Sequence, residues 1–132
     1  MSQPRTDLWR VVRLSELLAN VSGSEQIASM VVDEFLSHVD AQLGAVAAAL
    51  RAEDASQLLQ TAHRFKGSLA AIYAGAALEA ARTLEAAAKR RDFETARAEH
   101  LGLTERTREL VSYLKDWRAA HPTASTSGKL HG

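Results

Sequence analysis

The chain of 132 residues contains no cysteine. This absence excludes a disulfide framework, a zinc site built on thiolates and a cysteine nucleophile. A metal site on His38, His63 and His100 would need the fold to bring these residues together, and a His-x-x-x-His pair would support such a site. None of the five histidines is followed by another at that spacing. The sequence therefore predicts no metal site.

Proline and aromatic residues are also scarce. The two prolines, Pro4 and Pro122, lie near the ends of the chain, and aromatic residues make up only 5% of it. Long helices are therefore permitted between them, because proline is the residue that breaks helices. No regular apolar alternation with hairpin turns favours strands. The sequence predicts an all-α protein of one domain, with a core of alanine, leucine and valine.

An excess of either charge is missing as well. Sixteen basic and sixteen acidic residues give a net charge of zero, whereas binding of nucleic acid through its phosphates needs a basic face. The sequence has no signal-peptide pattern and no apolar run long enough to span a membrane. A glycine-rich phosphate loop is also absent. We therefore expect no nucleic acid or membrane partner, no bound nucleotide and a cytoplasmic location.

Apolar residues recur at intervals of three and four in five segments, which predicts five helices. Ser24, Asp54 and Asp92 are the expected N-caps of three of them, because a side-chain oxygen at that position accepts a free backbone N–H. The predicted helices span about residues 6–18, 24–52, 54–73, 76–89 and 92–117.

The predicted helix over residues 24–52 has an apolar stripe that begins with Ile27 and then Met30 or Val31. Gly44 lies inside this helix, and we expect it to allow close packing against a neighbour. The last predicted helix repeats in sevens, which indicates an inward face in a bundle. Its stripe contains Ala96, His100, Leu103, Thr107, Leu110, Leu114 and Trp117.

Four substantial helices with short joints predict an antiparallel up-and-down four-helix bundle, and the short helix over residues 6–18 is expected to cap one end. Residues 1–5 are expected to be flexible. The bundle is expected over residues 6–118. Residues 119–132 are rich in serine, threonine and glycine, which favours a disordered tail. We expect its last residues to come from the expression vector.

One stretch of the third helix carries the candidate site. His63 lies off the apolar stripe, and Lys66 and Gly67 follow it by three and four residues on the same exposed face. Glycine inside a helix costs about 1 kcal/mol relative to alanine, so Gly67 needs a reason. We expect it to leave room for a tetrahedral anion at His63, with Lys66 neutralising the anion. Arg64 adds a second cation for phosphate or an acidic partner.

Glu85 is the expected partner of His63. The third and fourth helices form a hairpin that turns near residue 74, and His63 and Glu85 are each eleven residues from that point. The two side chains should therefore meet. Glu85 would accept a hydrogen bond from Nδ1–H and leave Nε2 free as the nucleophile. The alternative is a solvated carboxylate that pairs with Lys89 one turn later.

These residues resemble the histidine-containing phosphotransfer (HPt) domain. The family pattern Ala-His-x-(apolar)-Lys-Gly-(Ser/Ala) is present as residues 62–68, and the resemblance extends from about residue 34 to residue 85 and more loosely to residue 117. The family also has glutamine or glutamate twenty-two residues after the histidine, which is Glu85 here. Glycine is frequent ten residues after the histidine, where this chain has Tyr73, and this departure puts the length of the turn in question.

The resemblance implies a helical bundle in which Nε2 of His63 accepts a phosphoryl group from an aspartyl phosphate in a receiver domain and passes it to another receiver. The implied partners are response-regulator receivers and a hybrid histidine kinase. Mg²⁺ would come from the receiver, so the chain needs no cofactor of its own, and we expect a monomer. Two other interpretations stay open: a non-catalytic helical adaptor, and the phospho-accepting domain of a chemotaxis-type kinase, which glutamate rather than glutamine at position 85 favours.

Overall fold

The computed structural model describes residues 23–121, and these residues contain four helices and no strand. The helices are α3 (Glu25–Ala52), α4 (Ala55–Ala71), α5 (Gly75–Lys89) and α6 (Phe93–Ala120). The predicted all-α fold is therefore confirmed. The predicted helix over residues 6–18 and residues 1–5, predicted to be flexible, lie outside the described residues. So does most of the predicted tail over residues 119–132, whereas Ala119 and Ala120 belong to α6.

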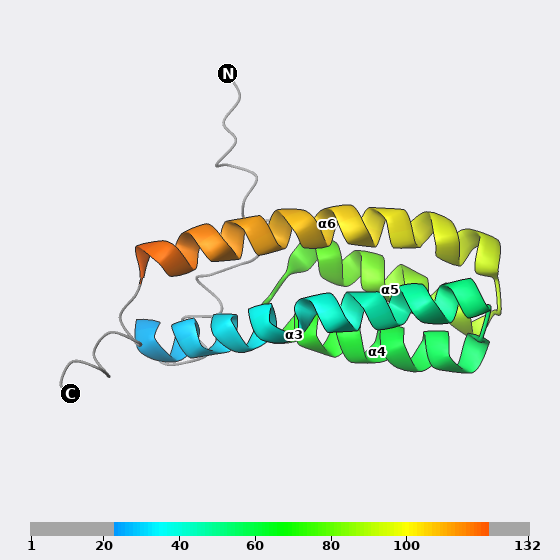
Figure 1. Cartoon of the computed structure of the whole chain (residues 1–132), viewed down its shortest axis with the longest axis horizontal. Helices are drawn as coiled ribbons and strands as arrows, with labels where there is room; N and C mark the ends of the chain where they lie inside the picture. Colours follow the sequence, from blue (N-terminus) through cyan, green and yellow to red (C-terminus); the bar gives the residue numbers. More distant parts are fainter. Residues whose placement is uncertain (1–22, 122–132) are drawn as a thin grey trace, which may run out of the picture.

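The four helices form an up-and-down bundle (Figure 1). Helix α3 packs against α4 and α6, and α5 packs against the same two helices. Helices α3 and α6 have 28 residues each, whereas α4 and α5 have 17 and 15. The start of α3 and the end of α6 consequently extend past the α4–α5 hairpin, as Figure 1 shows. At that end Arg118 binds both carboxylate oxygens of Asp33, at 2.8 and 3.1 Å.

Side-chain oxygens begin three of the helices, as the sequence predicts. Ser24, Asp54 and Asp92 accept backbone N–H groups at the starts of α3, α4 and α6, each at 3.0 or 3.1 Å. Helix α6 ends at Ala120, slightly beyond the predicted end at Trp117. Helix α4 ends earlier than predicted, at Ala71.

The core is built mainly from alanine and leucine, and Phe35 and Phe65 are its buried aromatic rings. Phe65 of α4 is fully buried, and burial of such a side chain contributes about 1.5–3 kcal/mol. Ala62 of α4 and Ala77 and Ala81 of α5 are also buried, so both helices of the hairpin carry small side chains in the core. The apolar stripe of the third predicted helix, which His63 lies off, is buried at Leu58, Ala62, Phe65, Leu69 and the C-cap Ile72. On α5 the buried apolar residues include Ala77, Ala81, Leu84 and Ala88.

Two expectations about α3 are wrong. Ile27 is 47% exposed, so the predicted stripe does not begin there. Of the two alternatives at the next step, Met30 is 59% exposed and Val31 is partly buried. The first turns of α3 bury Ala28 and Val32. This part of α3 lies beyond the α4–α5 hairpin, so the face toward α6 is the one that becomes buried (Figure 1). Gly44 does not support close packing either, because a Cβ built on it would meet no atom within 4 Å.

The three joints between helices have the same backbone conformation. Glu53, Tyr73 and Arg91 have φ angles of 52°, 57° and 57°, in the left-handed region. In each joint the next residue donates its N–H to the carbonyl five residues earlier, as in Ala74 to Leu69 at 3.0 Å. This is the Schellman motif, in which glycine is usual at the left-handed position. The joint after α4 therefore turns at Tyr73, whereas Gly75 already belongs to α5.

Arg91 allows a test of the free-energy cost of the left-handed conformation in these joints. A residue with a Cβ in the left-handed region costs about 1–2 kcal/mol relative to glycine, and Arg91 is exposed. We expect Arg91→Gly to raise the free energy of unfolding by about 0.5–1 kcal/mol, measured by urea denaturation. Arg91→Ala is the matched control, because it removes the same charge and keeps the Cβ. Equal stability of the two variants would contradict this account.

Candidate functional site

His63 is presented on the outer face of α4. Its side chain is 69% exposed. The residues beside it on the buried face, Ala62 and Phe65, have no exposed surface, so they fix the rotation of the helix about its axis. The ring therefore reaches solvent from a rigid helix, as the spacing of the apolar residues predicts.

Glu85 reaches the same site from α5. The residue is only 7% exposed. Its Oε2 lies 2.9 Å from Nδ1 of His63, and its Oε1 lies 2.7 Å from Nζ of Lys66. The predicted contact across the hairpin is present, so the alternative of a solvated Glu85 paired with Lys89 is wrong. Both carboxylate oxygens are bound by residues of α4.

The charge state of Glu85 determines which nitrogen of His63 carries the proton. Burial by itself raises the pKa of Glu85, but hydrogen bonds and charge from Lys66 and His63 outweigh burial and lower the pKa below the ordinary 4.5. The carboxylate is thus ionised at neutral pH and can only accept hydrogen bonds. Nδ1 must then be the protonated nitrogen. In the neutral ring, Nε2 consequently carries a free lone pair.

The ion pair between Lys66 and Glu85 was not predicted from the sequence. The expected role of Lys66 was to neutralise an anion from the exposed face, but its ammonium group is bound to Glu85 and its side chain is only 29% exposed. The spacing contained the signal: Lys66 follows His63 by one turn, so a carboxylate that reaches one of them from α5 is close to the other. Glu85 therefore fixes two functional groups of α4.

Gly67 and Arg64 lie on the exposed surface around His63. A Cβ at Gly67 would meet no atom within 4 Å, so packing within this chain does not require glycine there. Arg64 forms no ion pair within residues 23–121. The surface beside Nε2 is consequently open and carries one cation without a carboxylate partner.

The other described histidines are not brought to this site. His38 binds Glu34 at 2.9 Å, and His121 stacks on Trp117 with ring centroids 4.4 Å apart. His100 is partly buried on α6, and burial lowers its pKa. Residues 23–121 contain no group of three or more potential ligands placed to hold a metal ion. No described helix is long and apolar enough to cross a membrane.

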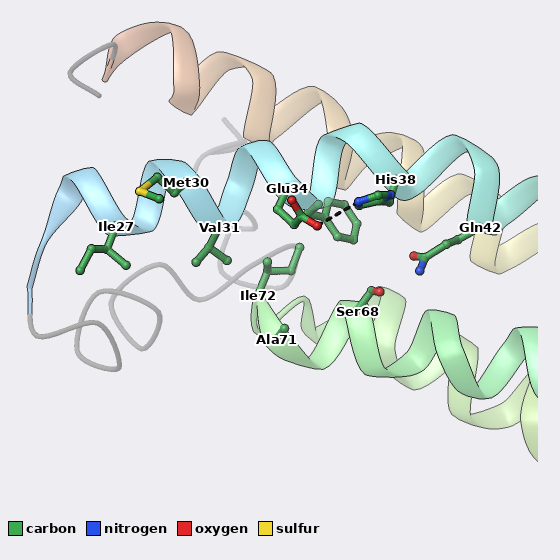
Figure 2. Close-up of a pocket in the computed structure, with 10 residues that line it drawn as sticks. Ile27, Met30, Val31, Glu34, His38, Gln42, Ser68, Ala71 and Ile72 are labelled. Atoms are coloured by element: carbon green, nitrogen blue, oxygen red, sulfur yellow. Dashed lines mark hydrogen bonds and ion pairs between the residues drawn. The ribbon is translucent and has the colours of Figure 1, made fainter. Parts of the chain in front are cut away.

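An apolar groove of about 620 Å³ lies between α3 and the end of α4 (Figure 2). Ser68, which follows Gly67, borders it from α4, and the exposed Ile27 and Met30 border it from α3. Two exposed apolar side chains of α3 thus form part of a surface that adjoins the helix of His63.

Comparison with known proteins gives the family of this fold and site. A family model described as the Hpt domain matches residues 30–120. The chain belongs to the Hpt domain family. The Hpt fold is also seen in the crystal structure of histidine-containing phosphotransfer protein B (HptB) from Pseudomonas aeruginosa PAO1. That structure matches with a TM-score of 0.78 and 24% sequence identity, over 84% of this chain and 96% of the other.

A comparison with curated protein sequences gives no match. Membership of the Hpt family assigns a histidine phosphotransfer function in phosphorelays. Hpt domains work with receiver domains and histidine kinases in these relays. The family model covers α4 and α5 completely, so the cluster of His63, Lys66 and Glu85 lies inside the matched region.

The lowered pKa of Glu85 predicts how the stability of this Hpt domain depends on pH. A carboxyl group whose pKa is lower in the folded state contributes stability above its unfolded pKa, and that contribution is lost as pH falls through the folded pKa. Wild type should therefore lose more stability between about pH 7 and pH 3 than Glu85→Gln, which has no titrating group there. Urea denaturation at the two pH values measures this.

Glu79→Gln is the matched control for that experiment. Glu79 lies on the same helix and binds Arg82 at 3.1 Å, but its side chain is 70% exposed. An exposed ion pair contributes only about 0–1 kcal/mol. Its removal should leave the acid dependence close to that of wild type. The account of Glu85 would be wrong if Glu85→Gln and wild type lost stability equally.

Proposed function

We propose that Nε2 of His63 accepts a phosphoryl group from the aspartyl phosphate of a receiver domain and passes it to an aspartate of another receiver. The observation that carries this proposal is the hydrogen bond between Glu85 and Nδ1 of His63 at 2.9 Å. An ionised carboxylate at this position keeps the proton on Nδ1 and directs the lone pair of Nε2 to solvent. The neutral ring is a competent nucleophile near pH 7.

The transfer step needs no proton to move on the histidine. The lone pair of Nε2 forms a bond to phosphorus, the bond between phosphorus and the aspartate oxygen breaks, and that oxygen leaves with the electron pair as a carboxylate. The reverse sequence delivers the phosphoryl group to a second aspartate. Such transfer depends mainly on positioning and charge stabilisation. The rigid face of α4 supplies the positioning for Nε2.

Charge stabilisation is divided between this chain and its partner. Lys66 lies one turn from His63 and already points to Glu85, so its ammonium group can share its hydrogen bonds between that carboxylate and a phosphate oxygen. Arg64 supplies a second cation for the phosphate or for an acidic partner surface. Mg²⁺ belongs to the receiver on this proposal, and this chain needs no cofactor of its own.

The working unit is proposed to be a cytoplasmic monomer. One chain contributes the nucleophile, its orienting carboxylate and the lysine from the single hairpin of α4 and α5, so the site is complete without a second copy. The partners are response-regulator receivers and a hybrid histidine kinase. A purely structural adaptor would not need a buried carboxylate that binds Nδ1 of an exposed histidine and leaves its Nε2 free.

The decisive experiment replaces the nucleophile. Incubation of the wild-type chain with a phosphorylated receiver should yield acid-labile phosphate on this chain, and His63→Gln should yield none. The fold should persist in the variant, because the side chain of His63 is 69% exposed. His38→Gln, with a side chain that is 58% exposed, should remain labelled and serves as the control. Labelling of His63→Gln, or no labelling of wild type by any receiver, would overturn the proposal.

The open surface at Gly67 gives a second test. Gly67→Gln should raise helix stability by up to about 1 kcal/mol and yet block transfer, because its side chain would occupy the space beside Nε2. Gly102→Gln is the matched control on α6, where a Cβ would likewise meet no atom within 4 Å. It should gain similar stability and transfer normally. Normal transfer by Gly67→Gln would remove the steric role of this glycine.

A further inference from the structure

A second groove lies on the opposite side of the bundle from His63. It has a volume of about 420 Å³ and lies between the end of α3 and the start of α6. His63 and Glu85 lie between α4 and α5, which pack together across the bundle from α3 and α6. A molecule in this groove would therefore leave the face of His63 accessible. The groove is lined by Ala47, Leu50, Arg51, Arg97, His100 and Leu101.

The chemistry of this groove is apolar with cations at its edge. Leu101 is 68% exposed, more than any other large hydrophobic side chain in residues 23–121. Two of the six lining residues are arginines and none is acidic. Arg97 binds Glu53 at 3.1 Å, whereas Arg51 has no ion pair among the described residues. The groove thus presents one uncompensated guanidinium beside a leucine in solvent.

His100 adds a polar group that lacks a partner. Its Nε2 is buried and has no hydrogen-bond partner within residues 23–121. A buried polar atom without a partner is unfavourable, so a bound segment that reached this atom with a hydrogen-bonding group would be favoured. Burial lowers the pKa of His100, which makes the ring neutral at pH 7. A neutral ring can donate to a carboxylate through whichever nitrogen carries its proton.

The ends of this chain do not fit the groove. Residues 1–22 contain three arginines against two acidic residues, and residues 122–132 contain no acidic residue. Both segments join the bundle at the start of α3 and the end of α6, whereas Arg51 and Arg97 lie at the other end of these helices (Figure 1). Charge therefore favours an occupant from another molecule.

We propose that this α3–α6 groove binds an acidic segment of a partner protein, with an apolar side chain covering Leu101 and a carboxylate at Arg51. Complementary charge would orient the segment, and the burial of Leu101 beneath its apolar side chain would supply most of the affinity. The bundle then has two binding faces, one for phosphotransfer and one for attachment.

Two synthetic peptides of equal length and leucine content test this, one with glutamate and one with lysine at the remaining positions. Titration of the full chain, followed by NMR of its backbone amides, should show binding of the glutamate peptide alone. The shifts should centre on Arg51 and on residues 97–101. Leu101→Ser should weaken binding about tenfold, and Arg51→Ala about threefold to fivefold. Both positions are exposed, so the fold should be retained.

Met30→Ser is the control, because Met30 is 59% exposed but lies on the other groove. It should leave the affinity for the peptide unchanged. Leu101→Ser should also transfer phosphate at the wild-type rate, which separates this proposal from the role of His63. Equal binding of both peptides, no binding of either, or shifts at the other groove would overturn it. Self-association that Leu101→Ser abolishes would overturn it too, since a second copy would then cover this face.

Discussion

The site depends on one buried carboxylate that joins two helices. Glu85 lies on α5, and both atoms that it binds, Nδ1 of His63 and Nζ of Lys66, lie on α4. These contacts exist only when the hairpin has the correct register, and the register depends on small buried side chains and on the joint after α4. Ala62, Ala77 and Ala81 allow the two helices to approach closely. The packing of the hairpin therefore determines the tautomer of the histidine.

Burial makes this arrangement all-or-none. Desolvation alone would favour a protonated Glu85, and the lysine and histidine reverse that preference. Removal of one partner of a buried charge pair typically costs about 3–5 kcal/mol, because it leaves the other charge without compensation. The same contacts that orient His63 thus also stabilise the hairpin that carries it. A variant that disturbs the site is consequently expected to affect stability and function together, except at exposed positions such as Gly67.

Much of the fold and the core of the site follow from local sequence rules. The helix starts were predictable because Ser24, Asp54 and Asp92 cap them, and Glu85 was predictable because residues equidistant from a hairpin turn lie side by side. Tyr73 did not disturb that register, since it adopts the left-handed angle of 57° that glycine would otherwise take. Burial at the start of α3 was not predictable in the same way. It depends on which neighbouring helices extend as far as the first turns of α3. The lengths of those helices decide this, and the spacing of apolar residues within α3 does not.

On the proposed function, the charges of the site favour transfer of the phosphoryl group over its storage. Before phosphorylation, the negative Glu85 and the positive Lys66 compensate each other, and the neutral form of His63 has the tautomer that Glu85 selects. A phosphoryl group on Nε2 would add negative charge that Lys66 can meet only by sharing its bonds with Glu85. Arg64 is exposed, and its charge is largely screened by solvent. This chain alone therefore stabilises a phosphorylated histidine weakly, and a partner that brings a divalent cation would draw the phosphoryl group onward.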